Sequence, residues 1–287
     1  MRAYVPSYEL ISTVSLSEVL DVLAQNLGVW KPFAGGTDLM VLLEAGKLTH
    51  KNYVNIWNLK ELRGIEVADN YVTLGALTTY TEVQEHPVLR DEFPMLCQAA
   101  GETGGIAIQN RGTLGGNVVN ASPAADSPPA LLAYDAELEL ISQTGERRIP
   151  YANFHRGYKQ MDIRPDELLR AIRLPRMPKP LTHYYHKVGT RKAQAISKVC
   201  FAAVGQVTDN RISHIRIALG SVAPIPIRCQ QTEAVLLNQT VNDQTIGNAA
   251  GSLAAEIAPI DDIRSTRDYR LQVSLNLLQD FLRNLDS

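Results

Sequence analysis

Two glycine pairs, each flanked by hydroxyl and carboxylate side chains, constrain this chain more than any other feature of its sequence. One lies in the segment 113–126, T-L-G-G-N-V-V-N-A-S-P-A-A-D, and the other in the segment 31–39, K-P-F-A-G-G-T-D-L. Glycine lacks a Cβ atom, so backbone N–H groups beside it can converge on an anion without steric cost. The two segments therefore predict loops that hold both ends of a long polar ligand, such as a dinucleotide.

Neither glycine pair has the spacing of a common phosphate-binding motif. The pattern G-x-x-x-x-G-K-[ST] is absent, which argues against a P-loop nucleotidase. No G-x-G-x-x-G opens a helix after a first strand, which argues against a Rossmann site. Either pair alone would be interpreted as a tight turn. The two together, with Asn117 and Asp126 nearby, favour a ligand-binding site.

Beyond their chemistry, these segments resemble the FAD-binding subunit of the molybdenum hydroxylases, the family of xanthine dehydrogenase and carbon monoxide dehydrogenase. That family has an A-G-G-T-D-L-like loop and, later, a T-x-G-G-N-x-x-N-A-S-P-x-x-D segment, and both are present here. The resemblance continues through D-E-L-L at 166–169, H-K-V-G-T-R at 186–191 and A-L-G-S-V-A-P-I-P-I-R at 218–228. It covers nearly the whole chain.

The resemblance implies an FAD site assembled from four segments. The glycines are expected to bring backbone N–H groups to the pyrophosphate, and Thr37 and Thr113 to add hydroxyl donors. Asp38, Asn117 and Asp126 are expected to bind ribityl, ribose or ring groups, because a carboxylate repels a phosphate. The residues expected to bind the cofactor are Lys31, Pro32, Phe33, Ala34, Gly35, Gly36, Thr37, Asp38, Leu39, Thr113, Leu114, Gly115, Gly116, Asn117, Asp126, Leu168, Leu169 and Lys187.

Three of these positions are assigned through the family alone. Residues that match Leu168 or Leu169, and Lys187, touch the flavin or adenine in the family, so the resemblance implies the same contacts here. Without the family, Leu168 and Leu169 would be interpreted as strand core. No side chain is assigned as an acid, base, nucleophile or metal ligand, and Ser122 does not lie in a G-x-S-x-G elbow.

The resemblance also implies partners. In this family the [2Fe–2S] clusters and the molybdopterin belong to other subunits, so FAD is the one cofactor expected here. An iron–sulfur subunit and a molybdopterin-binding large subunit are the expected partners, in a dimer of three-chain units. The isoalloxazine ring suits a junction between one-electron iron–sulfur relays and a two-electron acceptor. The expected function is to pass electrons from those clusters through FAD to NAD⁺ or another acceptor.

Several alternatives stay open at this point. Purines, aldehydes, N-heteroaromatic compounds and carbon monoxide are all compatible as substrates of the complex, and quinone, oxygen or a ferredoxin-like protein as acceptors. A self-sufficient flavin oxidoreductase is a rival within enzymes. A non-catalytic assembly subunit with the same fold is a rival of another class, although such a protein would gain nothing from intact glycine loops.

Composition narrows the class of protein. The 287 residues correspond to about two domains. A net charge of −2 gives no reason to expect nucleic acid or an anionic membrane as a partner. No apolar run is long enough to cross a bilayer, and the start at Met1 lacks the apolar stretch of a signal peptide, so a cytoplasmic location is expected. Cys97, Cys200 and Cys229 include no C-x-x-C pair and are interpreted as buried, inert thiols.

Hydrophobic spacing predicts an α+β fold. A helix is expected from a capping box at Ser15 and Glu18, with Leu27 on its apolar face. Three prolines at 175–180 predict a boundary between an FAD-binding domain, 1–176, and a C-terminal domain, 181–287, with a small antiparallel sheet and helices. Within the first domain, sub-parts of about 1–57 and 58–176 are expected, in a two-part fold of the molybdopterin-dehydrogenase or vanillyl-alcohol-oxidase-like type.

Two departures from the family pattern are present. Gln109 precedes Asn110 where family members commonly have an arginine, which is expected to change how the loop is braced. The segment 193–196, A-Q-A-I, stands where many members have an acidic residue, which is expected to change the surroundings of the flavin.

Overall fold

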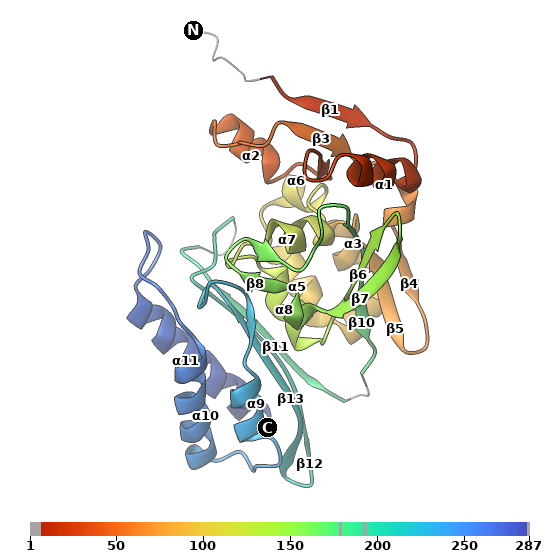
Figure 1. The fold of residues 1–287 in the computed structure, drawn as a ribbon. Helices are drawn as coiled ribbons and strands as arrows, with labels where there is room; N and C mark the ends of the chain where they lie inside the picture. The colour runs from red at the N-terminus through yellow and green to blue at the C-terminus, as the bar shows by residue number, and fades with distance from the viewer. Residues whose placement is uncertain (1–6, 178–179, 192–193, 286–287) are drawn as a thin grey trace.

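The computed structural model describes residues 7–177, 180–191 and 194–285, which form three stacked parts (Figure 1). Pro178 and Lys179, within the predicted domain boundary, and Ala193, within the second departure, lie outside the described residues, as does the start of the chain. An N-terminal layer lies on a central α+β part, and a C-terminal sheet with its own helices packs on the other side of that part. The predicted α+β class is confirmed.

The N-terminal layer is a small parallel sheet with two helices. Its strands are β1 (Glu9–Ser12), β2 (Lys31–Phe33) and β3 (Asn52–Asn55), in the order β1-β3-β2, and its helices are α1 (Leu16–Gln25) and α2 (Leu39–Glu44). The Ser15 side chain caps α1 as predicted, accepting from the N–H of Glu18 at 3.3 Å. The prediction for Leu27 is wrong: its side chain is exposed, because the backbone leaves the helix at Asn26 and turns at Gly28 with φ +74°.

The central part has a five-stranded antiparallel sheet in the order β4-β5-β10-β6-β7. The strands are β4 (Ile65–Val67), β5 (Tyr71–Gly75), β6 (Glu137–Ser142), β7 (Gly145–Pro150) and β10 (Leu168–Pro175). One face carries apolar residues such as Val72, Leu138 and Ile172 and is buried under helices, whereas the other face carries charged residues. The covering helices are α3 (Tyr80–Glu85), α4 (Pro87–Glu92), α5 (Pro94–Glu102), α6 (Ile106–Gln109), α7 (Leu114–Asn120) and α8 (Ser127–Ala133).

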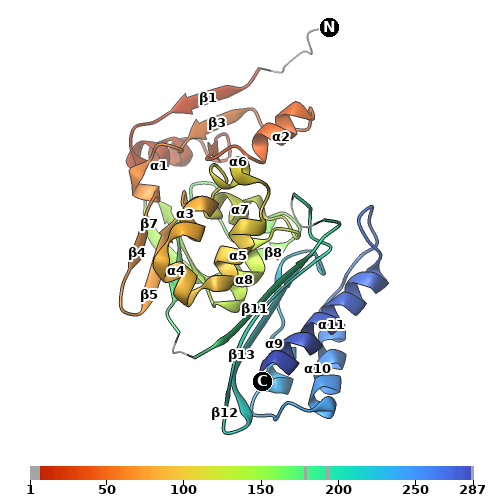
Figure 2. The same ribbon diagram turned by 180° about the vertical axis from the view of Figure 1, so that it is seen from behind.

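Three short elements complete the central part. The 3₁₀ helix η1 (Lys60–Leu62) lies between β3 and β4, and the 3₁₀ helix η2 (Tyr151–Asn153) lies between β7 and β8. Strand β8 (His155–Gly157) pairs with β9 (Gln160–Met161) as a separate hairpin. Figures 1 and 2 both place β8 beside α7.

The second glycine segment is a helix, and its prediction as a loop is wrong for residues 114–120. The Thr113 hydroxyl caps the helix by accepting from the N–H of Gly116 at 3.1 Å. The helix ends at Ala121, which takes a left-handed conformation with φ +49°. Intrinsic propensity disfavours glycine in helices, but the cap and the burial of Leu114 and Val118 outweigh it.

The C-terminal part is a four-stranded antiparallel sheet, β11-β12-β13-β14, with helices on its outer face. The strands are β11 (Thr182–Val188), β12 (Val199–Thr208), β13 (Arg211–Gly220) and β14 (Ile227–Arg228), and the helices are α9 (Gln230–Leu236), α10 (Asp243–Glu256) and α11 (Arg267–Leu285). The turn between β12 and β13 falls on Asp209 and Asn210, residue types typical of tight turns, and both residues have positive φ.

Strand β12 is buried on both of its faces. Val199, Phe201 and Ala203 pack in one hydrophobic core with the C-terminal helices, whereas Cys200 and Ala202 pack in the core of the central part. The alternation follows from the two-residue period of a strand. The C-terminal sheet therefore forms one wall of the central core.

Arg270 on α11 ties the loops at one end of this sheet together. Its buried guanidinium donates to the carbonyl oxygens of Lys198 and Ser221, each at 2.8 Å, and to Asp262 at 2.7 Å. Loss of this group would leave buried acceptors without a donor.

We expect Arg270→Met to lower the free energy of unfolding by about 2–4 kcal/mol, because the carbonyl oxygens of Lys198 and Ser221 lose this donor and Asp262 loses one of its donors. Urea denaturation measures the effect. Arg267→Met, three residues away on an exposed ion pair with Asp268, is the control and should change stability by no more than about 0.5 kcal/mol. Equal effects of the two substitutions would contradict the assignment.

Candidate cofactor-binding site

The two glycine segments lie close together in space. Gly35 packs so closely on the backbone just before the second segment that a Cβ atom added to it would lie 1.7 Å from the carbonyl oxygen of Arg111. The Arg111 side chain stacks on the ring of Trp57, with its guanidinium carbon 3.9 Å from the ring centroid. The N-terminal layer and the central part thus share the site.

The first glycine segment offers unused backbone donors. It lies between β2 and α2, with Gly36 at φ +77° and the N–H of Met40 bonded to the carbonyl of Gly36 at 2.9 Å. Within the described chain, the N–H groups of residues 35–39 donate no hydrogen bond. Consecutive free N–H groups with a left-handed residue among them form the kind of concavity that binds anions.

The second glycine pair has a different role. The N–H of Gly115 donates to the carbonyl of Ala76 at 2.9 Å, and that of Gly116 donates to the Thr113 hydroxyl. A Cβ atom on Gly115 would lie 2.6 Å from both Cβ and O of Ala76. The prediction that these two N–H groups point to the pyrophosphate is therefore wrong, because the chain itself already uses them: the N–H of Gly115 holds α7 to the residue after β5, and the N–H of Gly116 completes the cap of α7.

Side chains on and after α7 do present unused acceptors. Oδ1 of Asn117 and Oδ1 of Asp126 are both buried, and neither has a hydrogen-bond partner among the described residues. A buried acceptor without a donor is costly unless a ligand supplies one. FAD carries hydroxyl and ring N–H donors, so these two oxygens fit the cofactor that the resemblance implies.

Asp126 and Lys187 form a buried ion pair across the interface of the central and C-terminal parts. Nζ of Lys187, on β11, lies 2.7 Å from Oδ2 of Asp126 and 2.8 Å from the carbonyl oxygen of Glu102. Burial raises the pKa of Asp126 from 3.8 to about 6, although Lys187 acts in the opposite direction. The two residues predicted from separate motifs are thus in direct contact.

The segment that leads to Asp126 is held from the C-terminal side. The N–H of Ser221 donates to the carbonyl of Pro123 at 2.7 Å, and the hydroxyl of Ser197 donates to that of Ala124 at 3.2 Å. The Tyr185 hydroxyl donates to the carbonyl of Asp126 at 3.2 Å. These bonds hold the backbone that carries the Asp126 carboxylate.

The other predicted positions divide into two groups. Phe33 lies under Gly36, where a Cβ atom would come 2.7 Å from its ring, and the ring packs edge-on against Tyr53 at 6.2 Å. Leu168 and Leu169 are buried in β10, where strand core is expected, and their contact with the flavin stays a prediction. The remaining positions lie along the first segment: Lys31 and Asp38 are exposed, and Pro32, Ala34, Thr37 and Leu39 are half-buried.

Gln109, the first departure, joins neighbouring helices with an uncharged side chain. Its buried amide donates to the carbonyl of Gly101 at 2.9 Å and accepts from Gln84 at 3.2 Å. It links the end of α5 to α6. In the second departure, the Gln194 side chain is exposed and lies beside Gly105. A Cβ atom added to Gly105 would lie 2.9 Å from Nε2 of Gln194.

Sequence reasoning missed three residues at the site. Glu102 contributes the carbonyl that Lys187 binds, and Lys159, on the β8–β9 turn, donates to both the carbonyl and the side-chain oxygen of Asn120. Asn120 carried a signal, because it lies one helical turn after Asn117 in the glycine motif. Lys159 carried none, since only the fold brings its hairpin to α7.

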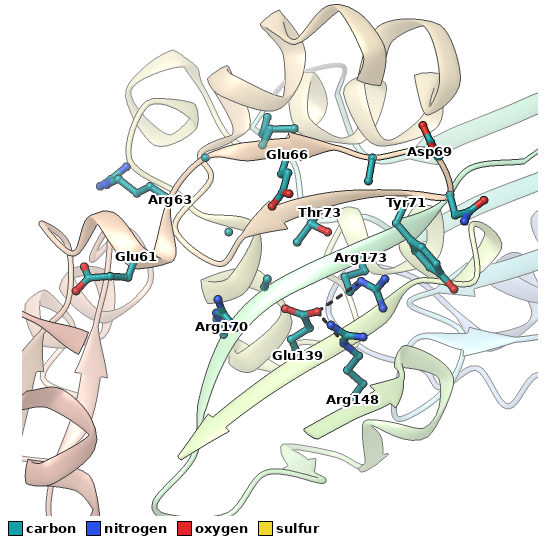
Figure 3. Close-up of a pocket in the computed structure, with 16 residues that line it drawn as sticks. Glu61, Arg63, Glu66, Asp69, Tyr71, Thr73, Glu139, Arg148, Arg170 and Arg173 are labelled. Carbon is teal, nitrogen blue, oxygen red and sulfur yellow. Dashed lines mark hydrogen bonds and ion pairs between the residues drawn. The ribbon is translucent and has the colours of Figure 1, made fainter. Parts of the chain in front are cut away.

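The large open cavity of the central part lies elsewhere. A cavity of about 820 Å³ covers the charged face of the five-stranded sheet, with Glu139 between Arg148 and Arg173 (Figure 3). None of the predicted cofactor residues lines it. Its four arginines face four acidic residues, so it has no net charge to attract a nucleotide.

The described residues carry no other obvious redox site. They include no group of three His, Cys, Asp or Glu side chains that could hold a metal ion, and no helix long and apolar enough to cross a membrane. The three cysteines are free thiols. Burial raises the pKa of Cys97 to about 11 and that of Cys200 and Cys229 further, so all three stay protonated at neutral pH.

The adjoining glycine segments and the unpartnered buried oxygens form a candidate cofactor site, and comparison with known proteins gives the family of the chain. Residues 6–177 match the family described as FAD binding domain in molybdopterin dehydrogenase, and residues 184–285 match the CO dehydrogenase flavoprotein C-terminal domain. The chain belongs to this family of FAD-binding dehydrogenase subunits.

Individual relatives support the same family. The chain is 36% identical over 269 residues to the xanthine dehydrogenase FAD-binding subunit of Escherichia coli O157:H7, covering 93% of this chain and 91% of that one. It is 28% identical to the carbon monoxide dehydrogenase medium chain of Hydrogenophaga pseudoflava over 92% of each chain. The solved structure of carbon monoxide dehydrogenase from H. pseudoflava superposes with a TM-score of 0.93 at 27% identity, over 98% of this chain and 97% of that one.

We expect Gly115→Ala to lower the free energy of unfolding by about 1–3 kcal/mol without FAD present, because the added methyl group would meet Ala76. Denaturant titration of the apoprotein measures it. Gly247→Ala, in α10 with nothing within 4 Å, is the control and should be stabilising by up to about 1 kcal/mol. A neutral Gly115→Ala would show that this glycine serves the ligand alone.

Asp126 should make the apoprotein less stable as the pH rises. Its folded-state pKa of about 6 lies above its ordinary 3.8, so its contribution to stability is fully present below pH 4 and is lost as the pH rises through 6. The stability of wild type relative to Asp126→Asn should fall by about 3 kcal/mol between pH 4 and pH 7. Urea titrations across this range test it, with the exposed Asp243→Asn as the control. A difference that grows with pH would refute the assignment.

Proposed function

We propose that this chain passes electrons from [2Fe–2S] clusters on a partner subunit, through bound FAD, to an external acceptor. Its partners are an iron–sulfur subunit and a molybdopterin-binding large subunit, and substrate is oxidised on the latter. The observation that carries the proposal is the junction of the two glycine segments, where free N–H groups of residues 35–39 adjoin the unpartnered oxygens of Asn117 and Asp126. Family membership supports the same conclusion.

The residues divide the binding of FAD between them. The N–H groups of the first segment bind the pyrophosphate, because they are free and form an anion-binding concavity. Asn117 and Asp126 accept from hydroxyl or ring N–H donors, and Lys187 holds the Asp126 carboxylate in place. When bound, FAD supplies an isoalloxazine ring that exchanges electrons singly or in pairs.

The names of the relatives support the partner assignment. They are a xanthine dehydrogenase FAD-binding subunit and a carbon monoxide dehydrogenase medium chain, both parts of larger assemblies by name. We place residues 1–176 in the FAD-binding domain and 181–287 in the C-terminal domain, and we place the complex in the cytoplasm. NAD⁺ is one acceptor that such a complex would use.

The purified protein should be yellow and should release FAD, and no FMN, when it is denatured. By itself it should not become reduced when purine, aldehyde, N-heteroaromatic substrate or carbon monoxide is added, because the clusters and the molybdenum centre belong to the partner subunits in this proposal, and the described residues include no group of three His, Cys, Asp or Glu side chains that could hold a metal ion. Stepwise addition of an iron–sulfur subunit and a large subunit should bring substrate-dependent bleaching of flavin absorbance.

The outcomes separate the alternatives. Bleaching with this chain alone would establish a self-sufficient flavoenzyme and refute the proposal. A colourless protein that takes up no added FAD would favour an assembly subunit. Co-purification from the native source identifies the partner chains directly.

A further inference from the structure

The positive charges around the junction of the glycine segments are mostly engaged. Lys187 is paired with the carboxylate of Asp126, and the Arg111 guanidinium stacks on Trp57. Lys31 is exposed on β2. A pyrophosphate carries two negative charges, and backbone N–H groups alone leave them without a counter-charge. Lys31 alone could balance one of these charges, so a second cation whose charge is not already neutralised is needed for the other.

Lys159 meets this requirement. It sits at the turn between β8 and β9 with φ +57°, and its ammonium group donates to the carbonyl and the side-chain oxygen of Asn120, the latter at 3.0 Å. Both acceptors are neutral, and the described carboxylates form no salt bridge with it. The hairpin is anchored to the same helix by His155, whose Nε2 lies 2.9 Å from the carbonyl oxygen of Val118.

The position of Lys159 relates it to both glycine segments. The Lys159 side chain is exposed, yet partial burial of its ammonium group lowers its pKa, and the carboxylate of Asp38, just before α2, acts in the opposite direction. Asn120, which holds the ammonium group, is one turn from Asn117 and on the same face of α7. That face carries the buried, unpartnered Oδ1 of Asn117.

We propose that Lys159, held by Asn120 at the end of α7, is the counter-charge for the FAD pyrophosphate. The inference rests on the proposed function and adds a binding residue to it. Asn120 holds the ammonium group in place with neutral oxygen atoms, so this contact does not neutralise its charge.

The competing explanation is structural. A cation at the C-terminal end of a helix stabilises the last carbonyls and the helix dipole, and Lys159 also does this for α7. A purely structural lysine would affect stability and every flavin equally. A counter-charge would affect only ligands that carry phosphate, and its effect would weaken with salt.

The test uses the full-length apoprotein and measures the binding of FAD and of riboflavin, which has no phosphate, by flavin fluorescence at several salt concentrations. Lys159→Met removes the charge and the hydrogen bonds, whereas Lys159→Gln removes the charge but keeps a donor for Asn120. Lys159→Arg keeps the charge. Lys60→Met, at an exposed lysine of η1, is the matched control.

We expect both neutral variants to bind FAD at least about tenfold more weakly at low salt, with a shallower dependence of the dissociation constant on salt. Riboflavin binding should be unchanged in them. Lys159→Arg should stay within about threefold of wild type for FAD, and Lys60→Met should match wild type for both ligands. Circular dichroism and thermal denaturation report whether each variant is folded. If Lys159→Met does not fold, Lys159→Gln is used in its place.

Two results would overturn the inference. Equal losses for FAD and riboflavin would show that Lys159 acts only on the structure of α7, and unchanged FAD binding in Lys159→Gln would show that its charge is not used. Failure of the wild-type protein to bind FAD would instead reject the proposed function, and the inference with it. The wild-type titration therefore separates the two failures.

Discussion

The two-sided burial of β12 is the constraint on which the rest of the site depends. Because Cys200 and Ala202 enter the central core while Phe201 and Ala203 enter the C-terminal core, the C-terminal sheet cannot move away without opening both. The same sheet carries Lys187 and Tyr185, which hold Asp126. A carboxylate on the central part is thus oriented by a strand from the other part, and the cofactor site is complete only when the two are packed together.

The four glycines of the two motifs do different physical work. Gly35 and Gly115 allow backbone to pack on backbone, against Arg111 and Ala76 respectively, whereas Gly36 provides a left-handed turn. Gly116 completes the cap of α7 with its N–H. Within the described chain the N–H groups of residues 35–39 donate no hydrogen bond, whereas those of Gly115 and Gly116 do. The two glycine pairs therefore differ in how they use their backbone donors. Substitution at Gly35 would act first on the contact between the N-terminal layer and the central part.

The candidate site has two regions that differ in charge. The Asp126–Lys187 pair is nearly neutral as a unit and buried, which suits contacts with hydroxyl and ring groups of a flavin. The junction of the first segment with α7 has free N–H groups and an ammonium group, which suits phosphate. The charged face of the five-stranded sheet balances its own charges and takes no part in either (Figure 3).

By itself, the sequence determined the fold class, most strands and helices, the two glycine segments and the residue types that a dinucleotide site requires. Ser15, Asp209 and Asn210 show why: caps and turns depend on local geometry that a few neighbouring residues specify. Only the tertiary structure decided that residues 114–120 are a helix and that Gly115 faces Ala76. It also decided that Lys187 meets Asp126 and that Lys159 reaches α7, since these contacts join residues 39–61 positions apart. No local pattern encodes such pairs, because they form only when separate hydrophobic faces pack together.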